Sequence, residues 1–590
     1  MNAPHTAFAT ALRRGFTTPH ALLQAGLWAL AAMLFVPFQI WRKAPPIPSF
    51  HGETAAVALG LLALTAVLPC AGRLPLPRAL GLILGFVALL LLQILLGMPA
   101  THQHALLGAL YLLWAAGLCV LAALLRRQLG LERTVTVLAW SLFAGALTSS
   151  LIVLAQELES YAFLGRFIVV ASKGGAWGNL AQPNHLADYL TLGLVSLAYL
   201  HAVGRLRPVY ALVAGLFALS ILSLTGSRTP WLYLGTLLVL AGAFFATDRS
   251  REHRRLLVVA AAGLLAFMLL APLLDLLGQF TSLQRPSLRT EVRPRLWYTA
   301  WLLFLDAPVL GQGFRQFGLH NFLLNGDLPP PRVTGFTDHA HNLLLTVMAE
   351  FGLAGLALLL AGALLWAAGL VRQPRSPALW WVCAIAAVLA IHSLLEYPLW
   401  YAFFLGPAAL VLGLGEAGAL ELRAAEQRPR RARLALAAVL VLGWVSLGQV
   451  FRDYLRMENF AALRYKYLHA TPEMTRSAMD TLLEMHRNSL LAPWVELGLA
   501  RSIQVSADGL RDKLTVNASA MRALPIDDVV YRQAMLLALA GDASGARRQW
   551  DRAVASFPSE REVAELVLRR RVEDGLNELR PLLEHAQAAR

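Results

Sequence analysis

The sequence predicts an all-α polytopic membrane protein with about 13 transmembrane helices, followed by a separate C-terminal α-helical domain. Composition is the first observation: 57% of the residues are hydrophobic and 15% are charged, whereas an ordinary soluble domain has about 25% charged residues. The mean hydropathy of +0.56 is typical of a polytopic membrane protein. Together with many long apolar runs, these values exclude a soluble multidomain enzyme, a disordered chain and a collagen-like protein.

The apolar runs define the spans. A helix needs about 20 apolar residues to cross the hydrocarbon core of a bilayer. No clear small-residue cleavage site follows the first run, so we expect a retained helix rather than a removed signal peptide. The candidate spans cover residues 21–40, 54–72, 80–98, 105–125, 134–155, 186–204, 208–224, 231–247, 256–277, 343–370, 378–394, 398–416 and 434–450.

The net charge of +15 comes almost entirely from the first 450 residues, which hold 31 Lys and Arg against 17 Asp and Glu. With the N-terminus in the cytoplasm, 20 of those basic residues lie on the inner side and 11 on the outer side, as the positive-inside rule requires. Only the pair Arg42 and Lys43 opposes the rule in a short outer loop. Thirteen spans then place the C-terminal 140 residues outside, which is the periplasm if the cell is Gram-negative. The basic charge should bind membrane lipids; no nucleic-acid-binding signature accompanies it.

Four regions follow from this topology. We expect N-terminal transmembrane helices in 1–155, a catalytic membrane core in 156–433, a last transmembrane helix in 434–450 and a periplasmic α-helical domain in 451–590. The core contains a large periplasmic loop, 278–342, whose short apolar stretch 293–305 should lie at the membrane interface. In the last region, the stretch 531–558 has the small-residue rhythm of one tetratricopeptide-like helical pair.

Polar residues that suit one reaction occur in segments of the predicted outer face. These segments are Gly175–His185, Thr225–Thr229, Arg285–Arg295 and Asp338–Asn342. A guanidinium group binds phosphate oxygens through two parallel hydrogen bonds and stabilises the charge of a leaving diphosphate. A neutral histidine can take the proton of an attacking hydroxyl. The set therefore predicts transfer from a lipid diphosphate to an alcohol. Arginine would replace a metal, because the outer face has no carboxylate cluster, and no cofactor is expected.

Simpler structural roles compete with these assignments. A lone arginine at a span end usually anchors the helix in the headgroup region, and we apply this interpretation to Arg285, Arg315 and Arg332. The His339–His341 pair can cap the tenth span, and Gln182 to His185 can cap the sixth. Tyr397 and Trp400 can serve as interface anchors.

Three motifs resemble the O-antigen ligase and O-oligosaccharyltransferase superfamily. His341-Asn342, then nine residues, then Gly352 and Gly355, resembles its His-Asn/Ser/Gln…Gly…Gly signature. Two further segments resemble its arginine segments: Thr225-Gly-Ser-Arg228, and Arg293-x-x-x-Trp297 followed by Asp306–Gly313. The segments 178–187, 392–401 and 453–456 resemble the protein O-oligosaccharyltransferase (PglL-type) branch.

This resemblance, which covers roughly 150–590, implies an enzyme that transfers a preassembled oligosaccharide en bloc. The donor would be the oligosaccharide linked to undecaprenyl diphosphate, and the acceptor a Ser or Thr hydroxyl of a periplasmic protein, with a pilin as one candidate. Arg228 and Arg293 would bind the diphosphate, and His341 would deprotonate or orient the acceptor. The lesser candidates are Gln182, His185, Arg289, Arg295, His339, Asn342 and Tyr397. Pro294 interrupts the arginine segment and leaves the choice between Arg293 and Arg295 open.

Other functions remain alternatives. Ligation of O-antigen to lipid A-core, or glycan polymerisation, would use the same chemistry on a different acceptor. A lipid-linked sugar transporter should carry polar residues inside its spans and repeated halves, whereas the spans here are nearly free of polar residues. A scaffold whose helical tail recruits partners would leave the arginine and histidine set unexplained.

Overall fold

The computed structural model describes residues 19–70, 74–170, 176–279, 288–418, 420–421, 429–466 and 472–588. The side chains of 288–291 and 461–478 are not described, and this excludes the side chain of Arg289. Gly175 and Arg285, which were named above, lie outside the described residues.

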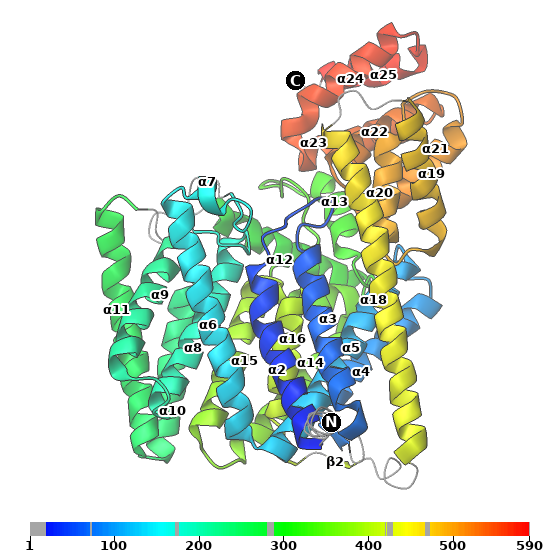
Figure 1. Ribbon diagram of the computed structural model, residues 1–590. Helices are drawn as coiled ribbons and strands as arrows, with labels where there is room; N and C mark the ends of the chain where they lie inside the picture. The colour runs from blue at the N-terminus through cyan, green and yellow to red at the C-terminus, as the bar shows by residue number, and fades with distance from the viewer. Residues whose placement is uncertain are drawn as a thin grey trace, which may run out of the picture. The chain divides into compact units, whose positions relative to one another are not determined.

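Each of the predicted apolar runs forms a helix, which confirms the helical class (Figure 1). Among the described residues, nine helices are long and apolar enough to cross a membrane, and three further apolar helices are shorter. The nine are α2 (Pro19–Gln39), α3 (Phe50–Val67), α5 (His102–Leu129), α6 (Leu131–Glu157), α10 (Thr229–Thr247), α11 (Arg251–Leu276), α14 (Leu343–Val371), α15 (Pro377–Leu395) and α18 (Pro429–Lys466). The shorter three are α4 (Ala79–Leu95), α9 (Pro208–Leu224) and α16 (Ala402–Leu414). The remaining run forms α8 (Pro183–Ala202), so the number of 13 spans stays a prediction.

The other described elements are short or belong to the loop and the tail. They are α7 (Tyr161–Leu164), α12 (Leu288–Asp306), α13 (Phe317–Asp327), α19 (Pro472–Asn488), α20 (Ala492–Ser502), α21 (Leu510–Ala523), α22 (Asp527–Leu539), α23 (Ala543–Ser556), α24 (Arg561–Glu573), α25 (Arg580–Ala588) and four short 3-10 turns. The two-residue strands β1 (Pro75–Leu76) and β2 (Leu420–Glu421) pair in antiparallel fashion.

The chain divides into two compact units, each assembled from three stretches. Unit 1 contains Met1–Gly85, Tyr111–Pro286 and Leu359–Gly448. Unit 2 contains Phe86–Leu110, Ser287–Leu358 and Gln449–Arg590. The predicted domain boundaries at residues 155, 433 and 450 remain predictions.

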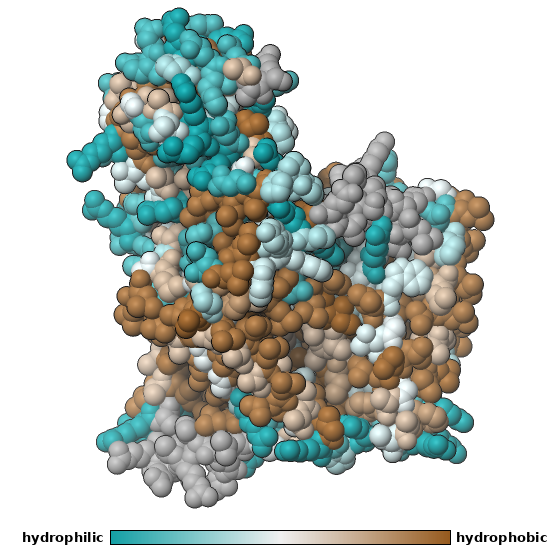
Figure 2. Space-filling model, turned by 180° about the vertical axis from the view of Figure 1, so that it is seen from behind, coloured by the Kyte–Doolittle hydropathy of each residue, from teal (hydrophilic) through white to brown (hydrophobic). Residues whose placement is uncertain are grey.

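Helix α8 forms the centre of unit 1. It packs against α6, α9, α10, α11 and α15, and 17 of its 20 residues are buried. The outer helices α9, α10 and α11 instead expose apolar side chains such as Val209, Leu212, Val239 and Leu265. Figure 2 shows a broad band of hydrophobic side chains, with hydrophilic side chains along the lower edge of the view and over its upper part. Helices that are apolar on their outer side suit a lipid environment, and α8 is shielded from it.

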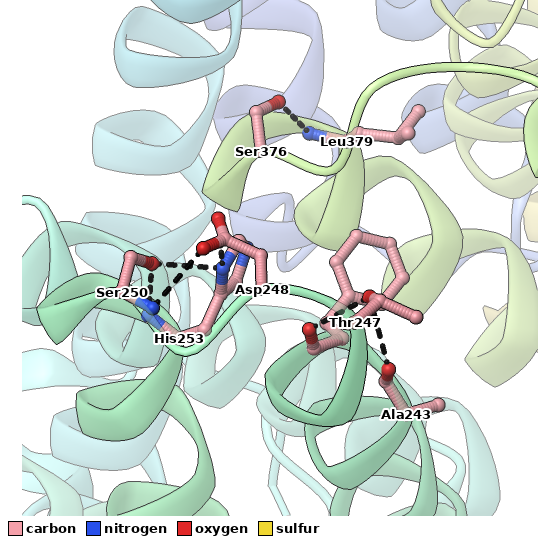
Figure 3. Close-up of polar contacts among 8 residues, drawn as sticks. Ala243, Thr247, Asp248, Ser250, His253, Ser376 and Leu379 are labelled. Carbon is pink, nitrogen blue, oxygen red and sulfur yellow. Dashed lines mark hydrogen bonds and ion pairs between the residues drawn. The ribbon is translucent and has the colours of Figure 1, made fainter.

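Serine side chains cap the N-termini of two helices of unit 1, α11 and α15 (Figure 3). The Ser250 hydroxyl accepts a hydrogen bond from the His253 amide (3.4 Å), which begins α11. Nδ1 of His253 lies 2.9 Å from that hydroxyl and 3.0 Å from Oδ2 of Asp248. The Ser376 hydroxyl accepts from the Leu379 amide (3.1 Å) in the same way at the start of α15. Such caps satisfy amide groups that have no partner inside the helix.

Unit 2 contains the tail helices and the loop helices. The expected helical pair in 531–558 is confirmed as α22 packed against α23, with the Tyr531 and Trp550 rings 5.0 Å apart. The tetratricopeptide classification stays a prediction. Helix α13 packs against α23, and the Asn325 amide donates to the Val333 carbonyl (2.8 Å) and to the Ser556 hydroxyl (3.0 Å). These hydrogen bonds tie the loop that follows α12 to the tail.

Helix α12 contains the short apolar stretch that was predicted to lie at the membrane interface, and that location stays a prediction. Leu296, Ala300 and Leu303 are buried on one side, while Trp297 and Trp301 are exposed on the other. It is not among the helices that qualify as spans in the described part of the chain.

Candidate active site

In unit 1, the segment before α8 is a helix cap. The Gln182 side-chain oxygen accepts a hydrogen bond from the His185 amide, and Pro183 occupies the first helical position. Proline suits this position because its missing N–H would have no partner there. The capping role that the sequence offered for Gln182 is therefore present, and it occupies the amide oxygen.

His185 lies inside the helix bundle with only 3% of its surface exposed. Its ring contacts the rings of Tyr401 (4.8 Å between centroids), Phe404 (5.3 Å) and His392 (5.5 Å), with Tyr397 at 6.4 Å. This aromatic enclosure keeps His185 within the core of unit 1. The structure therefore supports a packing role better than direct contact with a substrate.

Three residues from distant parts of the sequence meet beside this cap. The Asn184 amide donates to Oε1 of Glu396 (2.7 Å), and the Ser227 hydroxyl donates to Oδ1 of Asn184 (2.9 Å). All three are buried. Ser227 precedes Arg228, so these hydrogen bonds hold the turn in which the arginine lies.

Arg228 is exposed and takes the N-cap position of α10. Its neighbours Ser227 and Thr229 are buried, and the Ser227 hydroxyl lies 3.3 Å from that of Thr229. The N-terminus of a helix has a partial positive charge and free amide donors, which favour anions. A fixed turn that presents a guanidinium at such a helix end is well suited to bind phosphate oxygens.

In unit 2, α12 carries the second arginine segment. Nη2 of Arg295 donates to the Pro329 carbonyl (2.9 Å), and its guanidinium lies 5.9 Å from the centre of the Tyr298 ring. Arg295 therefore has a role in tethering the loop, and both Arg293 and Arg295 are half-buried on α12. The choice between the two for the diphosphate stays open.

In unit 2, the two histidines lie in the loop Asp338–Asn342, which we call the histidine loop. Arg315 and His339 both contact the Asp338 carboxylate in this loop. Nη1 of Arg315 lies 3.1 Å from Oδ2 of Asp338, and Oδ1 of Asp338 lies 2.8 Å from Nδ1 of His339. Burial alone would raise the pKa of Asp338, but the Arg315 guanidinium and the His339 hydrogen bond lower it more, so the net pKa falls below its usual range. The predicted membrane-anchor role of Arg315 is wrong, because its side chain pairs with Asp338.

His341 is held in an unusual backbone conformation. Its φ angle is +51°, in the left-handed region that residues other than glycine rarely adopt. Hydrogen bonds fix both sides: the Ala340 amide donates to the Thr346 hydroxyl (3.1 Å), and the Leu345 amide donates to Oδ1 of Asn342 (3.2 Å). Asn342 thus caps the start of α14, and the His339 and His341 rings lie 4.3 Å apart. Strain of this kind occurs most often at functional sites.

The glycines of the signature motif have a steric reason. Gly352 interrupts α14 with φ +60°, and a Cβ added there would come within 2.5 Å of the Val309 carbonyl. The amides of Leu353 and Ala354 donate to the Pro308 and Val309 carbonyls (2.8 and 3.1 Å). The absence of a side chain at Gly352 therefore lets the segment 308–313 pack directly on α14.

The burial and pairing of several polar residues in unit 1 were not predicted from the sequence. Asp188 and His392 are both fully buried, with Oδ2 of Asp188 3.1 Å from Nδ1 of His392. The expectation that the spans are nearly free of polar residues is therefore wrong for α8 and α15. A signal was present: Asn184 and Asp188 are four residues apart, which places them on one face of α8, and Glu396 follows His392 by four residues as the C-cap of α15.

Comparisons with known proteins agree with these motifs. Residues 213–360 match a family model described as O-antigen ligase, and residues 176–201 match one described as protein glycosylation ligase. Residues 380–570 match the C-terminal part of a virulence factor membrane-bound polymerase. A general O-oligosaccharyltransferase of Acinetobacter baylyi is 28% identical over 426 residues, which cover 69% of this chain and 72% of the relative.

Proposed function

We propose an activity from the premise that this chain belongs to the O-antigen ligase and protein O-oligosaccharyltransferase superfamily. Protein O-glycosylation by a glycosyltransferase is the activity that this membership supports at the family level. The more specific proposal is transfer of a whole oligosaccharide from undecaprenyl diphosphate to a Ser or Thr hydroxyl of a periplasmic protein, with a pilin as one candidate acceptor.

The observation that carries the proposal is the fixed turn around Arg228. An exposed guanidinium at a helix N-terminus, held by the buried Ser227 and Asn184, suits a diphosphate better than a neutral ligand. Either Arg293 or Arg295 in unit 2 is proposed as the second diphosphate-binding arginine, with Arg289 as a lesser candidate.

His341 is proposed to act on the acceptor. The acceptor oxygen attacks the anomeric carbon of the glycan, and the bond from that carbon to the diphosphate oxygen breaks. The hydroxyl proton passes to the imidazole of His341, and undecaprenyl diphosphate leaves with the electron pair. The arginines stabilise the negative charge that develops on the leaving group.

The proposed reaction needs no metal. Asp338 is the carboxylate nearest in sequence to the two histidines, and its two oxygens face His339 and Arg315. A guanidinium that already neutralises this carboxylate competes with a cation for it.

Two other functions have a specific observation in their favour. The O-antigen ligase and polymerase family models support glycan transfer to lipid A-core or to another glycan. The buried Asp188–His392 pair supports a transporter, because ionisable pairs inside helix bundles often serve proton relays.

The experiment that separates these functions is glycosylation in cells that lack their own transferase. The chain is expressed with a lipid-linked glycan, a set of periplasmic proteins that includes a pilin, and lipid A-core. The proposal predicts glycan on Ser or Thr of a protein. Glycan on lipid A-core, or longer glycan chains without modified protein, would contradict it. Translocation of the lipid-linked glycan without any transfer would identify a transporter.

A further inference from the structure

Two polar pairs join α8 to α15 in unit 1. Both lie near the N-terminal end of α8 and the C-terminal end of α15. Asn184 contacts Glu396 (2.7 Å), and one helical turn deeper Asp188 contacts His392 (3.1 Å). The two helices run in opposite directions, so residues four apart on one meet residues four apart on the other. We call these four residues the polar ladder; Figure 1 shows α8 and α15 side by side.

Helix stability does not explain the polar ladder. Asp188 and His392 have no exposed surface, and Asn184 and Glu396 are only 6% and 5% exposed. A buried ionisable pair in a bundle of this kind is usually no more stabilising than well-packed apolar side chains. The Asn184–Glu396 hydrogen bond and the Asp188–His392 ion pair one turn away do, however, link the two helices at two levels, which limits how far they rotate or shift along each other.

The Asn184–Glu396 pair of the ladder is also hydrogen-bonded to the turn that contains Arg228. Oδ1 of Asn184 accepts from the Ser227 hydroxyl (2.9 Å), and the same hydroxyl accepts from the Thr229 amide (3.4 Å). Arg228 is the residue between Ser227 and Thr229. A hydrogen-bonded chain that begins at Glu396, the C-cap of α15, therefore holds the backbone turn from which the Arg228 side chain extends.

We propose that the polar ladder positions Arg228 for the diphosphate. In this proposal its four residues act through the turn at Ser227 as positioning residues. The inference rests on the donor role of Arg228 that is proposed above. It adds a set of positioning residues inside the helix bundle to the residues of that site.

The test is a double-mutant cycle on donor affinity. The full chain is placed in lipid nanodiscs, and the Kd for undecaprenyl diphosphate is measured for Asn184→Ala, Arg228→Ala and the double variant. Each single change should weaken binding about tenfold, the effect of one hydrogen bond to a charged group. The double variant should bind no more weakly than Arg228→Ala, because both changes remove the same interaction.

Two further variants separate positioning from loss of structure. Ser227→Ala breaks only the link between the ladder and the Arg228 turn, so it tests the coupling even if Asn184→Ala does not fold. Ser196→Ala is the matched control: Ser196 accepts from the Trp381 indole (3.0 Å) between the same two helices, about three turns deeper. It should change the Kd less than about twofold, within the error of additivity.

Glu396 distinguishes a positioning role from a role in the chemistry. Glu396→Gln keeps an oxygen that can accept from Asn184 and should keep the Kd, whereas Glu396→Ala should weaken binding as Asn184→Ala does. Additive effects in the double-mutant cycle, or an equal loss of binding in Ser196→Ala, would overturn the ladder proposal alone. An unchanged Kd for Arg228→Ala would instead overturn the donor role, and the ladder proposal with it.

Discussion

His339 and His341 are two residues apart, yet their environments differ. His339 is buried and hydrogen-bonded to Asp338, whereas His341 is half-buried and has a left-handed backbone conformation. We expect His341→Ala to leave donor binding nearly intact and to abolish transfer, because its imidazole acts on the acceptor. His339→Ala should be milder. Donor Kd and transfer rate, measured separately on purified protein, check both. If His339→Ala is the more damaging change, the base is the other histidine; if His341→Ala also abolishes donor binding, His341 belongs to the diphosphate site.

The ion pair between Arg315 and Asp338 predicts a second residue-level effect. Asp338→Asn removes the charge that holds both Arg315 and His339, so the histidine loop should lose its fixed geometry. The loss of one charge-assisted contact should cost about 1.5–3 kcal/mol, or at least tenfold in transfer rate, with donor Kd unchanged.

The control for that change is Asp327→Asn. Asp327 also pairs with an arginine, Arg552 at 3.2 Å, but its side chain is 63% exposed. Exposed pairs contribute about 0–1 kcal/mol, so the transfer rate should stay close to that of the unmodified chain. Equal losses in the two variants would mean that the Arg315 pair has no special role.

At the level of elements, Gly352 sets the path of α14. A side chain at Gly352 would collide with the backbone of segment 308–313, which cannot move aside as a flexible side chain can. We expect Gly352→Ala to lower the melting temperature and abolish transfer, with a cost of about 1–3 kcal/mol from backbone strain alone. Gly369→Ala lies in the same helix with open space around it, and should be neutral. Thermal unfolding and transfer assays check the pair; a Gly352→Ala variant as stable and active as Gly369→Ala would contradict the steric explanation.

The helices were predictable because a run of about 20 apolar residues is a local property. The contacts between helices were not. Asn184 and Glu396 are 212 residues apart in the sequence, and nothing local indicates that their helices pair. Arg315 was assigned wrongly for the same reason: its partner Asp338 lies 23 positions later in the chain. The signature motif of His341 and Gly352 was recognisable from spacing, but the packing of segment 308–313 against it required the structure.

At the level of the whole molecule, one exception to the charge rule has a physical explanation. Lys43 lies in the loop between α2 and α3, where burial lowers its pKa to about 8, and the Glu53 carboxylate opposes that change. A nearby carboxylate therefore offsets part of the charge that opposes the predicted orientation.

The topology prediction concerns both ends of the last apolar helix. A reporter fused after Arg433 should indicate the cytoplasm, because basic residues cluster before this helix. A reporter fused after Ser477 should indicate the periplasm. Paired phosphatase and fluorescent-protein fusions provide the measurement. A cytoplasmic signal at both positions would remove one span from the count and place the tail away from periplasmic acceptors.

The most direct test of the central claim is transfer by the purified full chain in liposomes. The donor is an undecaprenyl-diphosphate-linked oligosaccharide, the acceptor is a protein that is modified in cells, and EDTA is present. We predict that intact oligosaccharide appears on Ser or Thr and that free undecaprenyl diphosphate is released in equal amount. Arg228→Lys, which loses the paired hydrogen bonds of the guanidinium, should raise the barrier by about 2–4 kcal/mol. Transfer that requires added Mg²⁺ or Mn²⁺, transfer of single sugars, or full activity in Arg228→Lys would contradict the account.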